Sequence, residues 1–216
     1  MKKAFTLAEV LVTLGIIGVV SAMTVPSLMQ NHQRKTYVTQ LHKVYNELQQ
    51  ASLQYMTDNN AINMKEAGIN SDDAASDFIK KYFKVVQDCG ADVSPCFPEY
   101  TLYKRLSGTA NSSWVGKRHF VLASGASVST YYHPADELLL EFWVDINGQK
   151  GPNIIGRDLF GMYMSVDGVL DDLTTNKFPL SKEERENLFS SSCNSSSGGL
   201  HGCFGKILND NWEMTY

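Results

Sequence analysis

Glu9 is the residue whose position most directly suggests chemistry, because it is the only charged side chain in an apolar run from Phe5 to Met29. As an α-helix this run would be about 37 Å long, enough to cross a hydrocarbon core of about 30 Å. A carboxylate inside such a run costs about 2.5–3.5 kcal/mol on insertion scales. Glu9 therefore predicts a helix whose amino end meets a cationic partner.

Two simpler interpretations of the same segment compete with this one. In a cleaved secretory signal peptide, Lys2 and Lys3 would form the basic region and Val20-Ser21-Ala22 the cleavage site. In a plain membrane anchor, the same two lysines would keep the amino end in the cytoplasm. Neither interpretation gives Glu9 a role.

The amino-terminal residues resemble a known family. Ala4-Phe5-Thr6-Leu7-Ala8-Glu9, the apolar run and Pro26 are together similar to the first segment of type IV pilins and type II secretion pseudopilins. The resemblance implies that a prepilin peptidase cuts between Ala4 and Phe5 and N-methylates Phe5, and that Glu9 guides docking. Ala4 departs from the glycine usual before the cut. In low dielectric, Glu9 of one subunit paired with the Phe5 amine of its neighbour would fix their register.

The resemblance also implies a role and a location. The chain would be a structural subunit of a type IV pilus or a type II secretion pseudopilus, held in the bacterial inner membrane by one span with its head outside the cytoplasm, and later part of a periplasmic or extracellular filament. Its partners would be inner-membrane lipid, the prepilin peptidase and other subunits. An alternative is a minor, tip-located subunit whose head binds a surface, a secreted substrate or DNA.

Composition and motifs argue against two other classes of protein. The five histidines are scattered and form no recognisable nucleophile motif with serine or cysteine, so no enzyme activity is predicted. The net charge is −4 and becomes −6 (−4 − 2) once Lys2 and Lys3 are removed. No basic stripe interleaved with aromatic residues stands out, so we predict no nucleic-acid binding from composition.

The resemblance, together with the pattern of the later segments, implies an α+β fold of the pilin type. We expect a leader at 1–4, a transmembrane and assembly helix at 5–29, the amphipathic half of the same helix at 30–58, and a globular head with a disulfide-closed tail at 59–216. Pro26 predicts a kink or local unwinding near 22–26. The amphipathic half is indicated by apolar residues at alternating spacings of four and three, namely Tyr37, Leu41, Val44, Leu48, Ala51 and Tyr55.

The head should combine a second helix with an antiparallel sheet. Ser71-Asp72-Asp73 is typical of a helix start, and the apolar face that follows predicts a helix extending to Val86, with a loop from Gln87 to Pro98. Four segments rich in β-branched and aromatic residues predict strands at 119–123, 127–132, 137–146 and 159–166. Residues 181–184 indicate a further short helix start.

The four cysteines suggest disulfides, because an even number in an exported domain favours pairing. Three connectivities are open, of which we favour the local pairs Cys89–Cys96 and Cys193–Cys203. Zinc binding is the rival interpretation, although the spacings differ from the close pairs of zinc ribbons.

The segment from Asp145 to Asp158 is a candidate calcium site. Oxygen-bearing side chains near two glycines faintly resemble a calcium loop, and the candidate ligands are Asp145, Asn147, Gln149, Asn153 and Asp158. The alternative, which we favour, is a structural turn in which Asp and Asn bond to backbone N–H groups. No other cofactor is expected.

Overall fold

The computed structural model describes residues 6–111, 116–195 and 199–216. The chain divides into two compact units, Met1–Thr36 and Tyr37–Tyr216. Helix α1 (Leu7–Asp58) supplies residues to both units.

In the first unit, α1 continues through Pro26 without interruption. The local unwinding expected near residues 22–26 is therefore absent. A proline removes only one backbone donor, and the hydrogen bonds of the turns on either side maintain the helix. Residues 6–33 are all exposed, including the large apolar side chains of this segment.

In the second unit, the remaining part of α1 buries the apolar stripe expected from the sequence. Leu41 and Leu48 are completely buried, and Tyr37, Val44 and Ala51 are nearly so. Tyr55 is half-buried and packs edge-on against Phe78 of the second helix. This half of α1 is therefore held by side chains of the head, as its amphipathic pattern predicts.

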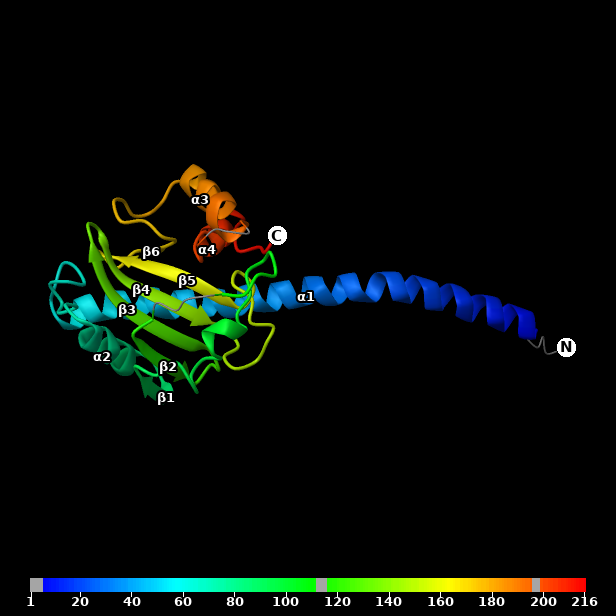
Figure 1. The fold of residues 1–216 in the computed structure, drawn as a ribbon, viewed down its shortest axis with the longest axis horizontal. Helices are drawn as coiled ribbons and strands as arrows, with labels where there is room; N and C mark the ends of the chain where they lie inside the picture. Colours follow the sequence, from blue (N-terminus) through cyan, green and yellow to red (C-terminus); the bar gives the residue numbers. More distant parts are fainter. Residues whose placement is uncertain (1–5, 112–115, 196–198) are drawn as a thin grey trace. The chain divides into compact units, whose positions relative to one another are not determined.

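The head contains a six-stranded sheet in which each strand pairs with its neighbours in sequence (Figure 1). All pairs are antiparallel, as expected where consecutive strands are joined by short connections. The strands are β1 (Val85–Gly90), β2 (Arg118–Leu122), β3 (Ser127–Ala135), β4 (Leu138–Asp145), β5 (Leu159–Ser165) and β6 (Leu170–Asp171).

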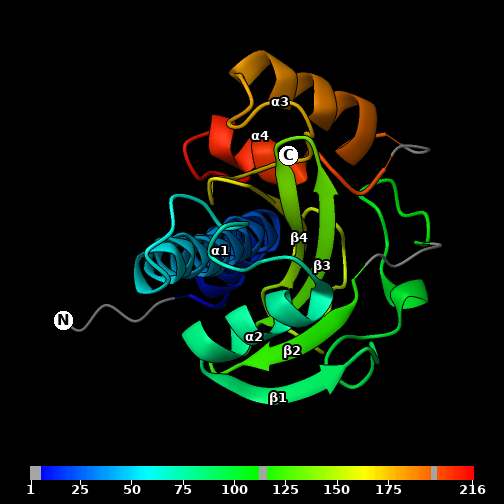
Figure 2. The same cartoon turned by 90° about the vertical axis from the view of Figure 1, so that its left-hand side faces the viewer.

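Both faces of the central strands are covered. Every residue of β4 and β5 is buried. Helices α1 and α2 (Asp72–Tyr82) lie on one face of the sheet (Figure 2). Buried residues of both helices share a core with Val128 of β3 and Phe142 of β4. The opposite face carries polar and aromatic residues such as Trp143 and Tyr163, which contact His201 of the carboxyl-terminal segment.

Helix α2 begins where the sequence indicates, since the Ser71 hydroxyl accepts a hydrogen bond from the Ala74 N–H at 3.1 Å. It ends at Tyr82, so the expected extension to Val86 is wrong. Residues Val85–Gly90 instead form edge strand β1, where a loop was expected from Gln87 onward. Its pairing with β2 is interrupted by two register shifts.

The carboxyl-terminal part forms short helices. They are α3 (Lys182–Leu188), a single π-helical segment (Phe189–Cys193) and α4 (Cys203–Asn209), and a 3-10 turn, Tyr100–Leu102, lies earlier in the chain. Ser181 and Glu184 form a reciprocal capping box at the start of α3, the helix start that the sequence indicates. After α4 the Trp212 ring stacks on His42 of α1, with centroids 3.9 Å apart.

Candidate processing and assembly site

The segment that should be processed lies at the start of the first unit. Ala4 and Phe5, the residues on either side of the expected cut, lie outside the described residues. Thr6 is described and immediately precedes α1. Glu9 is the third residue of the helix and the acidic residue of its first turn.

Thr6 and Glu9 form a reciprocal capping box. The Thr6 backbone N–H donates to Glu9 Oε2 at 2.8 Å, and the Thr6 hydroxyl donates to the same oxygen at 2.9 Å. In return the Glu9 N–H donates to Thr6 Oγ1 at 3.2 Å. The first N–H groups of a helix have no partner within it, and this arrangement satisfies two of them. Glu9 therefore caps the amino end of the helix, and it also carries the only charge of the apolar run.

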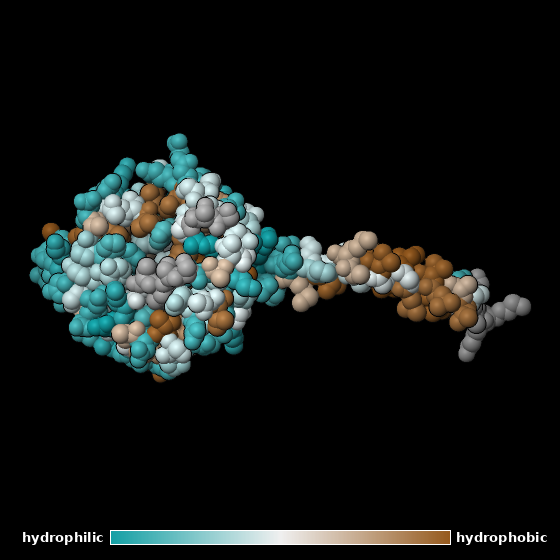
Figure 3. Space-filling view, viewed as in Figure 1, coloured by the Kyte–Doolittle hydropathy of each residue, from teal (hydrophilic) through white to brown (hydrophobic). Residues whose placement is uncertain are grey.

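The rest of this segment is long and apolar enough to cross a membrane. Among the described residues, α1 is the one helix that meets this criterion, and its apolar part is not buried within the structure. Hydrophobic residues gather along that part of α1 in the space-filling view (Figure 3). An apolar surface of this extent is expected to be covered by lipid or by other protein.

Comparison with known families agrees with this geometry. A family model described as the prokaryotic N-terminal methylation motif matches residues 1–25. The chain thus carries the signature of type IV pilins and pseudopilins, together with a single apolar helix that fits an inner-membrane anchor. The motif points to a structural subunit rather than an enzyme, and implies processing by a prepilin peptidase and assembly with other subunits. No curated protein and no solved structure matches the chain significantly.

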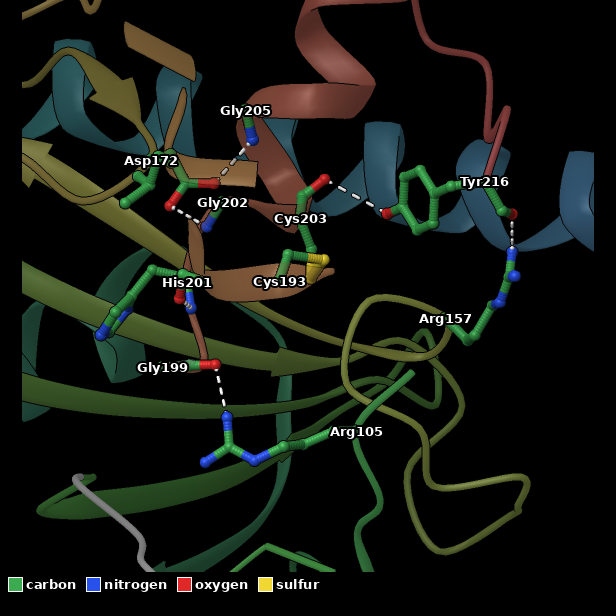
Figure 4. The surroundings of a disulfide bond; sticks show 12 residues. Arg105, Arg157, Asp172, Cys193, Gly199, His201, Gly202, Cys203, Gly205 and Tyr216 are labelled. Carbon is green, nitrogen blue, oxygen red and sulfur yellow. Dashed lines mark hydrogen bonds between the residues drawn. A yellow bond between two sulfur atoms is a disulfide. The ribbon is translucent and has the colours of Figure 1, made fainter. Parts of the chain in front are cut away.

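The predicted disulfides are confirmed. Cys89 pairs with Cys96 and Cys193 with Cys203. The second bond closes the segment that leads into α4 (Figure 4). Both of its cysteines are buried, which is typical of a structural disulfide.

The residues of the predicted calcium loop surround two buried carboxylates. Asp145 Oδ2 accepts the Tyr103 hydroxyl at 2.5 Å and Oδ1 accepts the Asn147 N–H at 3.1 Å. Asp158 accepts the N–H groups of Asn153 and Ile154 at 2.7 and 2.6 Å. All four carboxylate oxygens thus bond to protein donors, as in the structural turn favoured from the sequence.

Two of the remaining three candidate ligands, Gln149 and Asn147, bond within the protein through their amide nitrogens, whereas the side-chain oxygens of Asn147 and Asn153 are buried and accept no hydrogen bond from the described residues. Gln149 Nε2 donates to the Pro95 carbonyl at 2.6 Å, and Asn147 Nδ2 donates to the Gly151 carbonyl at 3.2 Å. Among the described residues there is no group of three or more His, Cys, Asp or Glu side chains that could hold a metal ion. Calcium binding at this loop stays a prediction.

Burial shapes the electrostatics of this loop. It raises the pKa of Asp145 to about 7, and the nearby charge of Asp158 adds to the rise. Burial also raises the pKa of Asp158. The Tyr103 pKa is raised by burial and by Asp145, so the phenol stays a donor to that carboxylate. Tyr103 is completely buried, and nothing in the sequence distinguished it from the other tyrosines.

Sequence reasoning also missed a pair of buried aspartates beside the second disulfide. The completely buried Asp172 accepts the N–H groups of Gly202 and Gly205 at 2.8 and 2.7 Å (Figure 4). Asp171, equally buried, forms a bidentate pair with Arg185 at 2.9 and 2.7 Å. A single buried carboxylate is costly unless it is bonded, and here each is matched to its own donors.

Proposed function

We propose that the mature chain is a structural subunit of a helical filament, either a type IV pilus or a type II secretion pseudopilus, assembled through α1. The observation that supports this most strongly is the methylation motif at residues 1–25 combined with Glu9 as the one charge of the apolar run. Cleavage between Ala4 and Phe5 would create an ammonium group at Phe5. Glu9 of a neighbouring subunit would neutralise it in a medium where either charge alone is costly.

Sequencing the amino terminus of the mature protein tests the processing step. The expected result is a chain that begins with N-methylated Phe5. A chain that begins at Met23, after the alternative signal-peptide site, or at an uncut Met1 would refute the proposal.

The docking role of Glu9 is tested by substitution. Glu9→Gln keeps an oxygen that can accept the hydrogen bonds of Thr6 but removes the charge, whereas Glu9→Ala removes both. If the charge guides docking, both variants are cleaved and inserted normally but fail to enter filaments. Normal assembly of Glu9→Gln would show that the carboxylate serves only as a helix cap.

Abundance separates a major subunit from a tip-located one. Counting copies along isolated filaments should give one chain at every helical position for a major subunit. A single copy at one end would instead favour the binding-module alternative, in which the head recognises a surface, a secreted substrate or DNA.

A further inference from the structure

The second unit contains a groove with a volume of about 540 Å³. It lies between α1, the junction of α2 with β1, and the turn that joins β2 to β3. Tyr82 and Phe83 contribute aromatic walls, and the exposed Ser124 lies on the turn. Its size is in the range of grooves that accept a few residues of a peptide.

Charges along the groove are cationic on balance. Lys43, Lys84 and Glu47 line it, which gives a net charge of +1 (+2 − 1) in a chain of net charge −4. Lys43 lies 3.8 Å from Glu47. Lys84 is exposed and has no ion-pair partner among residues 6–111, 116–195 and 199–216. The groove therefore offers an uncompensated ammonium beside aromatic rings.

The complementary charge lies on two turns of the same sheet, which we call the acidic end. Asp136 and Glu137 form the β3–β4 turn, and Asp167 lies in the β5–β6 turn. The Val166 N–H donates to the Glu137 carbonyl at 2.7 Å, so the two turns are adjacent. Asp136 and Asp167 are both exposed.

The groove and the acidic end cannot meet within one molecule. The β2–β3 turn and the β3–β4 turn stand at opposite ends of β3, whose nine residues span about 30 Å at about 3.3 Å per residue. A contact between different patches of identical molecules is heterologous. Unless it closes into a ring it repeats into an open helical polymer.

We propose that the groove binds the acidic end of a second copy of this chain, with Lys84 facing Asp136 and Asp167 of that copy. The proposal rests on the filament function above and adds to it a contact between heads, distinct from the contact made by the apolar part of α1. Charge complementarity at such a contact sets the register of the two copies more than their affinity.

A charge-swap experiment with the full-length chain and its assembly machinery tests this contact. Lys84→Glu and Asp167→Lys should each lower the amount of subunit in sheared filaments roughly tenfold. The double variant Lys84→Glu with Asp167→Lys should restore it to within about twofold. Lys104→Glu makes the same charge change at an exposed position that neither lines the groove nor bonds to the acidic end, and should leave incorporation unchanged. Asp167 is preferred to Asp136 because Asp136 has a φ of 51°, which a lysine adopts less readily.

A photo-crosslinking residue at Ser124 locates the occupant directly. The expected product is a crosslink to residues 134–138 or 166–168 of another copy. Three outcomes would overturn the proposed contact while leaving the filament function intact. They are normal filaments from Lys84→Glu, lack of rescue in the double variant, and a crosslink to another protein or to another part of the chain. Absence of filaments from the unaltered chain would instead remove the filament function, and this contact with it.

Discussion

Glu9 receives both hydrogen bonds that Thr6 can donate, which couples the charge of the apolar run to the start of its helix. The pattern Thr-x-x-Glu is visible in the sequence, and its geometry follows directly from helix-start chemistry. Any docking partner of Glu9 therefore approaches a carboxylate that is already held in place by its own chain.

Replacing Thr6 by Val tests this coupling. Valine has the shape of threonine but lacks the hydroxyl that accepts the Glu9 N–H at 3.2 Å. Loss of such a cap costs about 1 kcal/mol, so amide exchange in the first turn should be roughly fivefold faster in detergent-solubilised protein. Thr6→Ser is the matched control and should exchange at the original rate. Equal protection in Thr6→Val and the unaltered chain would show that the cap contributes nothing.

Asp172 illustrates what the sequence does not contain. Its donors, the N–H groups of Gly202 and Gly205, come from a segment about 30 residues later, and no local pattern marks the contact. The Ser71 cap, by contrast, depends only on residues within one helical turn, and it was predicted correctly. At the residue scale, the sequence predicts hydrogen bonds between residues close together in the chain. It does not predict bonds between residues that are far apart in the chain.

At the scale of elements, the β4–β5 loop joins the two disulfide-closed segments. Gln149 bonds to Pro95 inside the first segment. At the other end of the loop, Gly156 lies against the second disulfide. A side chain there would place its Cβ 2.7 Å from Cys203 Sγ and 3.3 Å from Cys193 Sγ.

Gly156→Ala should therefore destabilise the head. Gly156 also has a φ of 84°, in the left-handed region that disfavours alanine. We expect a loss of about 2–3 kcal/mol in the free energy of unfolding, measured with denaturant. Gly151→Ala is a control in the same loop, where the nearest atom would lie 3.9 Å away. A loss in Gly156→Ala no larger than in Gly151→Ala would contradict the assigned contact.

Calcium binding by this loop predicts a clear response to chelation. If the ion binds only the folded loop, removing it with a chelator should lower the melting temperature, and adding back Ca²⁺ but not Mg²⁺ should restore it. An unchanged melting temperature would leave the turn with a structural role alone, for which its hydrogen bonds suffice.

Strand β1 shows why one element was assigned incorrectly from sequence. The residues KKYFKVV continue the apolar spacing of α2, and that periodicity favours a helix. In the structure Val85 pairs with Leu122 of β2, a partner from 37 positions later (122 − 85). Tertiary pairing thus overrides the local period. The positions of β2 to β5 were predicted because their β-branched and aromatic content agrees with their pairing, whereas the two-residue strand β6 was not predicted.

Across the whole molecule, buried ionisable groups set how stability depends on pH. The pKa values of Asp145 and Asp172 are raised by burial to about 7 and about 6, above the ordinary value of 3.8. Their contribution to stability is complete below about pH 4 and is lost as the pH rises through 6 and 7. Burial lowers the pKa of His201 to about 4. The free energy of unfolding contributed by this histidine therefore rises with pH between about pH 4 and 6.5, opposite to the effect of the two aspartates.

Titration of Asp145 makes the largest contribution between pH 6 and 7.5, where Asp172 and the unfolded-state His201 make smaller contributions that are opposite in sign to each other. The free energy of unfolding should fall by about 1 kcal/mol over this interval. Asp145→Asn removes the titrating group, and its amide can still bond to the Tyr103 hydroxyl. Denaturant unfolding of both proteins at the two pH values checks this. A slope that is the same in Asp145→Asn would assign the pH dependence to another group.

The fold class as a whole followed from the sequence, because the long helix, the strand-rich middle and the paired cysteines are each strong patterns. The arrangement of the carboxyl-terminal part did not. Trp212 reaches α1 with a φ of 63°, a backbone conformation rare for a bulky residue, and stacks on His42. Such a contact is fixed by packing between segments distant in sequence, which composition and periodicity do not encode.

The two edge strands of the sheet, β1 and β6, affect how readily this protein can misassemble. Strand β1 is interrupted by two register shifts, and β6 has only two residues, so neither margin presents a long flat row of backbone donors and acceptors. Bulged or very short outer strands are the features that hinder uncontrolled cross-β aggregation. Subunits crowded together in a bilayer would then lack an easy route to amyloid-like stacking, and polymerisation would be left to helices and side chains.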